Sequence, residues 1–431
     1  MKKTSQNKSV FSWFYKYRNL LLVFVIFILS FSLRAYGMDD KYPFGWDQVD
    51  TAWTSKNMII NHEYPLVGMV AKQNTGFYIG PLYYYLVTFF YWVTNLNPVA
   101  SHYVALLSNI STFFVIFLIA KKLFSFRVAL MACFINSIAF SGFYFDAVQW
   151  PVSFLPGISL LIFYFLYRIL KGEEKYIILL AIVTGLSFHI HFTAVFFPII
   201  ILLCLPFFPR TKKMIIYFLL SIPVGLLWFI PNIASQLQQG SQLGSISKYL
   251  DDYYHGFHLR RFIQLMGDGL IQFDPFLSLE RIKPFKILII PIFLLVFLRE
   301  KISKDKLVFS YLVIIFFLVP WIVFSTYKGE ISDYYFSANR FIALLVISYL
   351  SSMLLFSKKL LVKVIFIIFL VYYSYLNLNS ILKYKDEGGL RKRFQNVKPY
   401  VDSGRKVEFQ QGVPESYIYY YLMREKGVSV Y

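Results

Sequence analysis

Four carboxylates stand close together near the start of the chain, in an arrangement that could move a proton. Asp39, Asp40, Asp47 and Asp50 lie within twelve residues, although the chain has only 23 acidic groups among its 431 residues. If a helix begins near Asp47, then Asp47 and Asp50 are three residues apart and share one of its faces. Such a pair could hold a proton acceptor. The alternative is that Asp47 caps the helix while the other carboxylates are solvated.

A second group of ionisable side chains is embedded in apolar sequence. His189 and His191 alternate within an apolar stretch, Arg340 begins another apolar run, and Arg260 lies in a stretch rich in histidine and aromatic residues. An ionisable residue in such surroundings is a functional candidate, and an arginine can hold a phosphate through two parallel hydrogen bonds. The alternatives are that the histidines cap helix ends and that the arginines extend toward lipid headgroups.

The elements that position these side chains are predicted to cross a membrane. Hydrophobic residues make up 58% of the chain and charged residues only 15%, where a soluble domain has ~25% charged residues. About eleven apolar runs are each close to the ~20 residues that cross a bilayer as a helix. The composition therefore excludes an ordinary soluble enzyme and predicts an all-α polytopic membrane protein. The predicted spans are residues 19–37, 101–120, 127–142, 153–169, 176–190, 193–208, 214–231, 285–298, 307–325, 341–356 and 361–380.

The distribution of basic residues predicts the orientation of these spans. Lys and Arg outnumber Asp and Glu by 43 to 23, which gives a formal charge of +20. They gather in every second connection, whereas the connections at 141–152 and 187–193 hold none. Basic loops stay on the cytoplasmic side, so we expect a cytoplasmic N-terminus in a cell membrane and no nucleic-acid partner.

This orientation divides the chain into a membrane domain, residues 1–380, and an outward C-terminal tail, residues 381–431. Two long segments of the membrane domain also face outward, at 38–100 and 232–284. The apolar stretch 81–94 is predicted to be a helix in the outer interface, because a span there would invert every later basic loop. Val49, Ala52 and Trp53 are expected to rest on the membrane. In the tail, two helical patterns and the alternating run 405–411 predict a small α/β subdomain.

A tyrosine-rich turn follows the carboxylates in the first outward segment. Gly76 and Gly80 are four residues apart and precede a proline, and the clustered tyrosines around them include Tyr78 and Tyr83. Tyrosines at an interface commonly form an anchoring belt. The glycines favour a binding role, because a tight turn without side chains lets backbone approach a ligand.

These motifs resemble a known family. The order is W-D-Q-x-x-D from Trp46, then G-x-Y-x-G-P-L-Y-Y-Y-L from Gly76, then a span that ends in Lys121, Lys122, Leu123 and Phe124. This order resembles the C-type membrane glycosyltransferases of the protein-mannosyltransferase and aminoarabinose-transferase superfamily, often labelled family 39. The resemblance is strongest over residues 19–200 and continues more loosely to 380. It implies transfer of a sugar from a polyprenyl-phosphate carrier to an acceptor hydroxyl on the outer face of the membrane.

The resemblance also implies roles for individual residues. Asp47 matches the loop-one aspartate that serves as the family's catalytic base, and Asp50 would orient it. The chain has Gly80 where aminoarabinose-transferase relatives carry a lysine, so the carrier phosphate would be held elsewhere, by Lys72 with Arg340. No cofactor is expected to be required, although paired carboxylates can hold a divalent cation. The acceptor would be a lipid, a glycan or a protein, and single displacement would invert the anomeric centre.

Two other classes of membrane protein share this topology. A flippase or transporter of lipid-linked saccharides would also have many spans, but such proteins place ionisable groups near the middle of the bilayer and often contain internal repeats. In this chain the polar residues collect on one side of the membrane, which favours an interfacial enzyme. A polymerase of surface polysaccharides is the other alternative, and topology alone does not separate it from a transferase. Cys133 and Cys204 both lie in apolar runs and are expected to pack as small side chains rather than to bind a metal.

Overall fold

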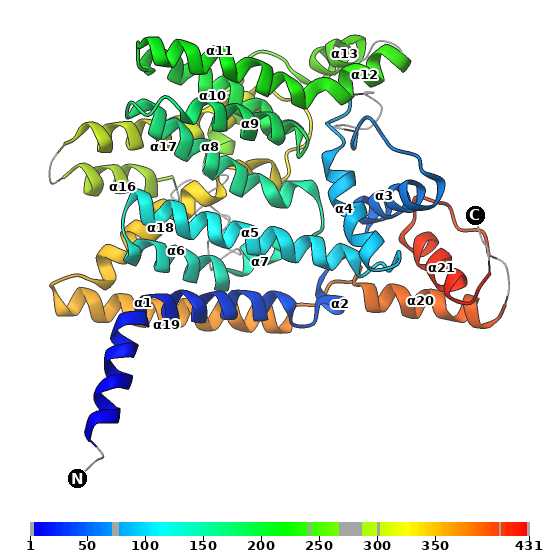
Figure 1. Ribbon diagram of the computed structural model, residues 1–431, viewed down its shortest axis with the longest axis horizontal. Helices are drawn as coiled ribbons and strands as arrows, with labels where there is room; N and C mark the ends of the chain where they lie inside the picture. The colour runs from blue at the N-terminus through cyan, green and yellow to red at the C-terminus, as the bar shows by residue number, and fades with distance from the viewer. Residues whose placement is uncertain are drawn as a thin grey trace.

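The chain folds as an almost entirely helical protein. The computed structural model describes residues 4–70, 77–239, 243–266, 287–299, 302–404 and 407–428, and β pairing within these residues is limited to three isolated bridges. The two termini lie at opposite ends of the molecule, with most of the long helices running between those ends (Figure 1). The predicted all-α polytopic class is therefore confirmed.

Each predicted span contains a helix in the structure. Among the described residues, seven segments are long and apolar enough to cross a membrane. The pair α6 (Phe126–Ile138) and α7 (Phe140–Asp146) meets at a bend of 70° and makes an eighth if it counts as one span rather than a re-entrant loop. The seven are built from α1 (Thr4–Ala35), α5 (Ala100–Leu123), α8 (Leu155–Leu170), α11 (Lys212–Leu226) continued by α12 (Ile230–Gln239), α17 (Lys304–Ser325), α18 (Ser337–Leu355) and α19 (Leu360–Lys383).

Three predicted spans form shorter helices. These are α9 (Tyr176–Phe188), α10 (Phe196–Cys204) with its flanking turns, and α16 (Ile289–Leu298). Their length alone does not show that they cross a membrane, so the total of eleven spans stays a prediction.

The helix α18 lies at the centre of the bundle. It packs against α6 on one side and α8 on another, while α9 and α11 continue the stack beyond α8 (Figure 1). The middle of α18 is fully buried, because Ile342, Ala343, Leu344 and Leu345 have no exposed surface. Apolar side chains on all sides of a helix are what a helix enclosed by other helices requires.

A buried group of three charges joins the helices near one end of the bundle. Asp146, at the end of α7, accepts a hydrogen bond from Arg34 of α1 at 2.8 Å and another from Arg340 of α18 at 2.7 Å. The two arginine side chains are only 2% exposed. Arg34 also donates to Asn109 of α5 at 2.5 Å. Because burying a charge is costly unless it is paired, these contacts fix α1, α5, α7 and α18 relative to one another.

The segment 38–100, predicted to face outward, and the tail form one layer at the same end. The segment contains α2 (Met38–Lys41), α3 (Trp46–Lys56) and α4 (Leu82–Val93), and the tail contains α20 (Leu390–Asp402) and α21 (Pro414–Glu425). The stretch predicted as an interfacial helix is α4. Residues 407–411 of the tail form no strand, so the expected α/β subdomain is helical over the part that the structure describes.

The apolar side of α3 faces the protein. Val49 and Ala52 are buried in a cluster shared with α4 and both tail helices, and Trp53 packs against Tyr417 and Tyr420 of α21. The expectation that these residues rest on the membrane is therefore wrong. The tail covers the surface that was assigned to lipid.

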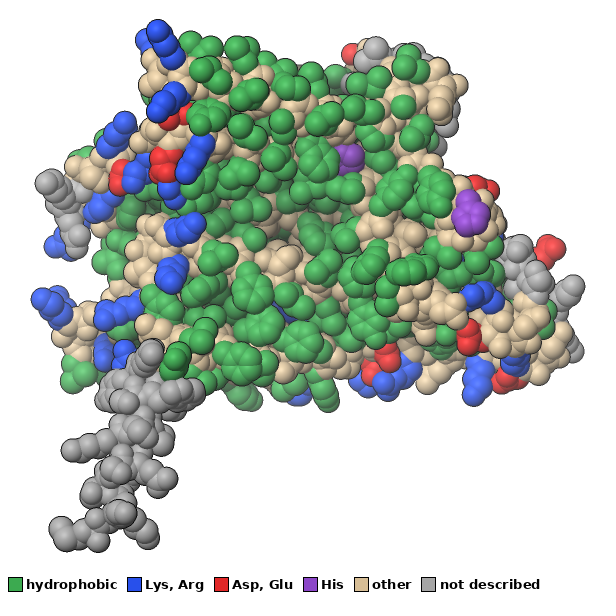
Figure 2. All heavy atoms as spheres, in the orientation of Figure 1, with side chains coloured by type: hydrophobic (Ala, Val, Ile, Leu, Met, Phe, Trp, Pro, Cys, Tyr) green, Lys and Arg blue, Asp and Glu red, His purple; other side chains and the backbone are tan. Residues whose placement is uncertain are grey.

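Charged side chains are distributed unevenly along the bundle. Lys and Arg predominate at the end far from α3, α4 and α21, the flank between the ends is largely hydrophobic, and basic and acidic side chains mix near the tail (Figure 2). At the basic end Lys171 pairs with Asp305, joining the end of α8 to the start of α17.

Removing the buried carboxylate should destabilise the bundle. We expect Asp146→Asn to lower the free energy of unfolding by about 3–5 kcal/mol, because it leaves two buried guanidinium groups without a counter-charge. Asp305→Asn is the matched control, since its ion pair with Lys171 is largely exposed and is worth about 1 kcal/mol or less. Thermal unfolding in the same detergent would measure both. Equal losses in the two variants would contradict the structural role of Asp146.

Candidate functional site

The helix α3 presents both predicted catalytic carboxylates on one accessible face. The helix begins at Trp46, and Gln48 accepts a hydrogen bond from the backbone N–H of Gly45 at 2.8 Å. The cap is therefore made by Gln48, and the alternative that Asp47 caps this helix is wrong. Asp47 and Asp50 lie on the solvent-accessible side, whereas Gln48 and Val49 are buried.

The surroundings of the two carboxylates raise their pKa values. Neighbouring helices displace much of the water around Asp47, and the charge of Asp50 adds to this effect, so its pKa lies above the ordinary value. Asp50 accepts a hydrogen bond from the Tyr84 hydroxyl at 2.6 Å, but loss of hydration outweighs this contact and its pKa is also raised. A carboxylate with a raised pKa is a stronger base while it remains ionised.

Gln149 connects α3 to α4 by hydrogen bonds, and the sequence did not indicate this role. Its backbone carbonyl accepts from the Gln48 side chain at 2.5 Å, and its side-chain carbonyl accepts from Thr51 at 3.3 Å. Its amide donates to the Tyr83 hydroxyl at 2.6 Å. Tyr83 is thus buried and held by the protein, although the turn motif had indicated substrate binding. Gln149 follows Asp146 by three residues, so the buried charges and the carboxylate helix are connected through one short segment.

His189 holds the glycine-proline turn in place. Its Nε2 donates to the carbonyl of Trp228 at 2.8 Å, and its Nδ1 accepts from the backbone N–H of Leu82 at 3.3 Å. A Cβ atom at Gly80 would lie 2.1 Å from Nδ1 of His189. The glycine therefore admits the histidine ring rather than a ligand, and the tight turn serves packing. The carbonyl of Tyr78, in the same turn, accepts from Asn232 at 3.3 Å.

His191 lies between an aromatic cluster and a cavity. Its Nδ1 contacts the Thr193 hydroxyl at 2.8 Å and accepts from the Thr193 backbone, so it begins the following turn as a helix cap. Its ring centroid is 5.9 Å from that of Tyr334. The charge of Asp47 acts on Tyr334 through electrostatic interaction. His191 therefore contacts Tyr334 directly, and Tyr334 lies within electrostatic range of Asp47.

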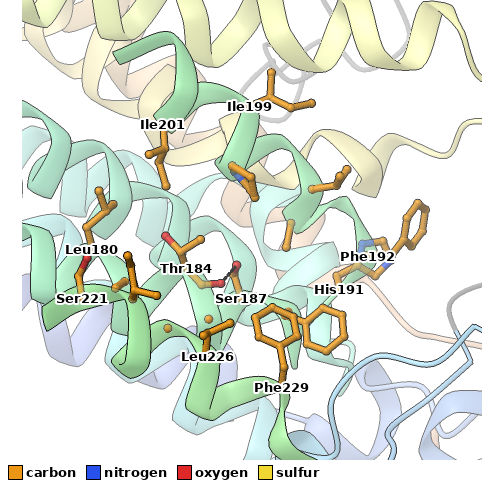
Figure 3. A pocket seen from close by; sticks show the side chains of 18 of the residues that line it. Leu180, Thr184, Ser187, His191, Phe192, Ile199, Ile201, Ser221, Leu226 and Phe229 are labelled. Atoms are coloured by element: carbon orange, nitrogen blue, oxygen red, sulfur yellow. Dashed lines mark hydrogen bonds between the residues drawn. The ribbon is translucent and has the colours of Figure 1, made fainter. Parts of the chain in front are cut away.

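The cavity beside His191 has a volume of about 660 Å³. It is enclosed by α9, α10, α11 and α13 (Leu243–Tyr253), and its lining is predominantly apolar. His191 and Phe192 lie toward one end, and Leu180 and Ser221 lie toward the other (Figure 3). Such a cavity fits a hydrocarbon chain, and His191 contributes an imidazole to its described lining.

The predicted phosphate contacts are not gathered into one group. Arg340 is buried against Asp146, so it does not extend to lipid headgroups, and Arg260 is exposed on α14 (Leu259–Leu265) and is not part of the cavity lining. Lys72 lies outside the described residues. Among the residues that the structure describes, no three His, Cys, Asp or Glu side chains are grouped as metal ligands.

Comparisons with known proteins agree with this architecture. The family model of dolichyl-phosphate-mannose-protein mannosyltransferase matches residues 79–234. The fold is similar to that of ArnT from Cupriavidus metallidurans in the apo state, with a TM-score of 0.58, 12% identity, and coverage of 95% of this chain and 85% of ArnT. The structure of ArnT bound to undecaprenyl phosphate is also similar, with a TM-score of 0.53, 11% identity, and coverage of 95% and 75%.

A third similar structure is the archaeal oligosaccharyltransferase AglB from Archaeoglobus fulgidus, in complex with an inhibitory peptide and a dolichol-phosphate. Its TM-score is 0.58 and its identity 15%, and the match covers 95% of this chain but only 60% of AglB. A search of curated protein sequences finds no match. The family-model match and the similar solved structures confirm the resemblance to C-type membrane glycosyltransferases. The matched family region includes Tyr83, His189 and His191 and excludes the two carboxylates.

The close packing at Gly80 can be tested directly. We expect Gly80→Ala to lower the free energy of unfolding by at least about 1–3 kcal/mol, because its new methyl group overlaps the His189 ring. Gly256→Ala is the control, since a Cβ there meets nothing within 4 Å. Thermal unfolding would compare the two. If Gly80→Ala is as stable as Gly256→Ala, His189 does not occupy the position described.

Proposed function

We propose that this chain, which has the fold of C-type membrane glycosyltransferases, transfers a sugar from a polyprenyl-phosphate carrier to an acceptor hydroxyl outside the cytoplasm. The observation that supports this most strongly is the apolar cavity, whose lining includes His191, together with the aromatic contact between His191 and Tyr334. A lipid carrier needs a hydrocarbon site, and its reacting carbon needs a base nearby. The cavity would supply the hydrocarbon site, and Asp47, whose charge acts on Tyr334, would supply the base.

The donor would bind with its hydrocarbon chain in or beside the cavity. Its phosphate would then lie near His191, and its sugar would extend past Tyr334 toward Asp47. The similar structures of ArnT and AglB contain undecaprenyl phosphate and dolichol-phosphate respectively. Lys72 and Arg260 remain proposed contributors to neutralising the phosphate, whereas Arg340 is buried and paired with Asp146. No cofactor is required by this reaction, although the carboxylates are compatible with a divalent cation.

The chemistry is a single displacement with Asp47 as the base. The acceptor oxygen attacks the anomeric carbon while Asp47 removes its proton, and the bond from that carbon to the phosphate oxygen breaks. The electron pair leaves on the phosphate, which needs no general acid. The anomeric configuration inverts. Asp50, held by Tyr84, would orient Asp47, which acts as a base only at pH values above its raised pKa.

The charge distribution supports the proposed orientation. The basic end of the bundle (Figure 2) would face the cytoplasm, so the N-terminus would lie inside and the carboxylates and tail outside.

The direct test is transfer by the purified protein. A panel of radiolabelled polyprenyl-phosphate sugars would be scored for release of carrier phosphate, and Asp47→Asn should lower turnover at least ~10²-fold by removing the base. Asp251→Asn, an exposed carboxylate on α13, is the matched control and should keep the parental rate. Carrier flipping without release of phosphate would instead indicate a flippase or transporter. Full activity in Asp47→Asn would exclude this residue as the base.

The pH dependence supplies a second test. A base works when deprotonated, so activity should be present above the pKa of Asp47 and be lost as pH falls through it. Since partial loss of hydration and the Asp50 charge raise that pKa, the acid limb of the rate profile should lie above ~3.9, the ordinary value of an aspartate. Asp50→Asn removes one charge and should move the limb to lower pH. A limb that moves upward or stays in place would contradict this coupling.

A further inference from the structure

Trp46 is unusually exposed for a tryptophan. Its side chain is 66% exposed at the first position of α3, directly before Asp47. Tryptophan is large and mostly buried in proteins, so an exposed one beside reactive groups requires an explanation. Anchoring at the membrane interface is the ordinary explanation.

Trp92 has the surroundings expected of a tryptophan that anchors a protein in the membrane interface. Trp92 of α4 is also 66% exposed, and its exposed neighbours are the apolar side chains Phe89 and Val93. These residues form a hydrophobic stripe suited to lipid. The exposed neighbours of Trp46 on its own helix are instead Asp47 and Asp50. Trp46 is as exposed as Trp92, but its exposed neighbours are carboxylates rather than apolar side chains. We therefore distinguish Trp46 from tryptophans that anchor a protein in the membrane interface.

The C-terminal tail contacts α3 along the side of the helix that carries Trp46. Trp46, Asp50 and Trp53 follow one another at intervals of four and three residues, so they share one stripe of the helix. A Cβ atom at Gly412 would lie 3.1 Å from Cζ3 of Trp46, which shows that the indole lies against this part of the tail. The Trp53 indole donates to the Ser416 hydroxyl at 3.1 Å. Asp50 therefore lies between two points where the tail contacts α3.

The two sides of the carboxylate pair differ in character. On one side the charge of Asp47 acts on Tyr334, which contacts His191 of the cavity lining, and the lipid-linked donor would arrive from there. On the side of the tail the exposed Trp46 ring lies against Gly412, which directly follows the exposed residues Gln410 and Gln411. An acceptor must approach the base from a side that the donor leaves free.

We infer that Trp46 and tail residues 410–412 form a binding subsite for an acceptor saccharide. A pyranose ring has one face of C–H groups, which stacks favourably on an aromatic ring, and a rim of hydroxyls. The indole would take the C–H face, while the amides of Gln410 and Gln411 would bind hydroxyls. This places another hydroxyl of the same sugar near Asp47. The inference rests on the proposed function and narrows its acceptor from a lipid, glycan or protein to the sugar portion of a glycan or glycolipid.

The test is oxidation of tryptophan by N-bromosuccinimide in the full chain, read residue by residue by peptide mass spectrometry. Methyl hexopyranosides and short hexose oligosaccharides are the probes. At ten times its Kd, a bound saccharide should slow oxidation of Trp46 about tenfold by occupancy alone, and Trp92 should be unaffected. Because this readout needs no turnover, it remains informative even if no donor in the panel reacts.

The other outcomes contradict the inference in separate ways. Protection of Trp46 only by a polyprenyl-phosphate sugar would place it in the donor site, and protection only by peptides would indicate a protein acceptor. Equal behaviour of Trp46 and Trp92 with every saccharide would assign Trp46 to general surface exposure.

Kinetics give a second readout once a donor is known. Trp46→Phe should raise the KM for the saccharide acceptor while leaving the KM for the donor unchanged, because a smaller ring stacks less surface. Trp92→Phe is the matched control and should change neither constant. A rise in the donor KM alone in Trp46→Phe would overturn the assignment.

Discussion

The sharing of Asp146 by two buried arginines is the interaction on which the rest of the structure depends. Arg34 comes from the first span and Arg340 from the central helix α18, so one carboxylate joins distant parts of the bundle. Three residues later, Gln149 holds both α3 and α4 by hydrogen bonds. The helix that carries Asp47 and Asp50 is therefore joined to the bundle through the short segment between Asp146 and Gln149. Catalysis by positioning requires such support, because small displacements of a base are costly.

Around this support, the proposed reaction would use three surfaces. The apolar cavity approaches from α9, α10 and α11, the tyrosines of α4 lie behind the carboxylates, and the tail covers the far side of α3. Each surface suits a different part of the reaction: hydrocarbon for the carrier, hydroxyls for holding Asp50, and an aromatic ring with amides for a sugar. The long-range contacts made by His189 tie the cavity wall to the turn before α4, so the cavity and the carboxylate layer form one unit.

Much of the fold could be predicted from the sequence, because a span must be continuously apolar and a basic loop must stay in water. The pairing of Asp47 with Asp50 on one helix face was predictable for the same kind of reason, since it depends on spacing of three residues. What the sequence could not show were contacts between distant positions. The partner of Arg340 lies 194 residues away, and the helix that covers Val49 and Trp53 belongs to the tail. Gly80 was misinterpreted because a glycine that admits a neighbouring ring looks the same in sequence as one that admits a ligand.

Under the proposed function, a lipid carrier and the carboxylates of α3 belong to one site. A structure of the protein in a lipid bilayer with bound polyprenyl phosphate tests it most directly. The account predicts hydrocarbon density in the cavity lined by α9, α10 and α11, with the phosphate between His191 and Asp47. Density for the carrier on another face of the bundle, with its phosphate separated from Asp47 by the protein, would contradict it.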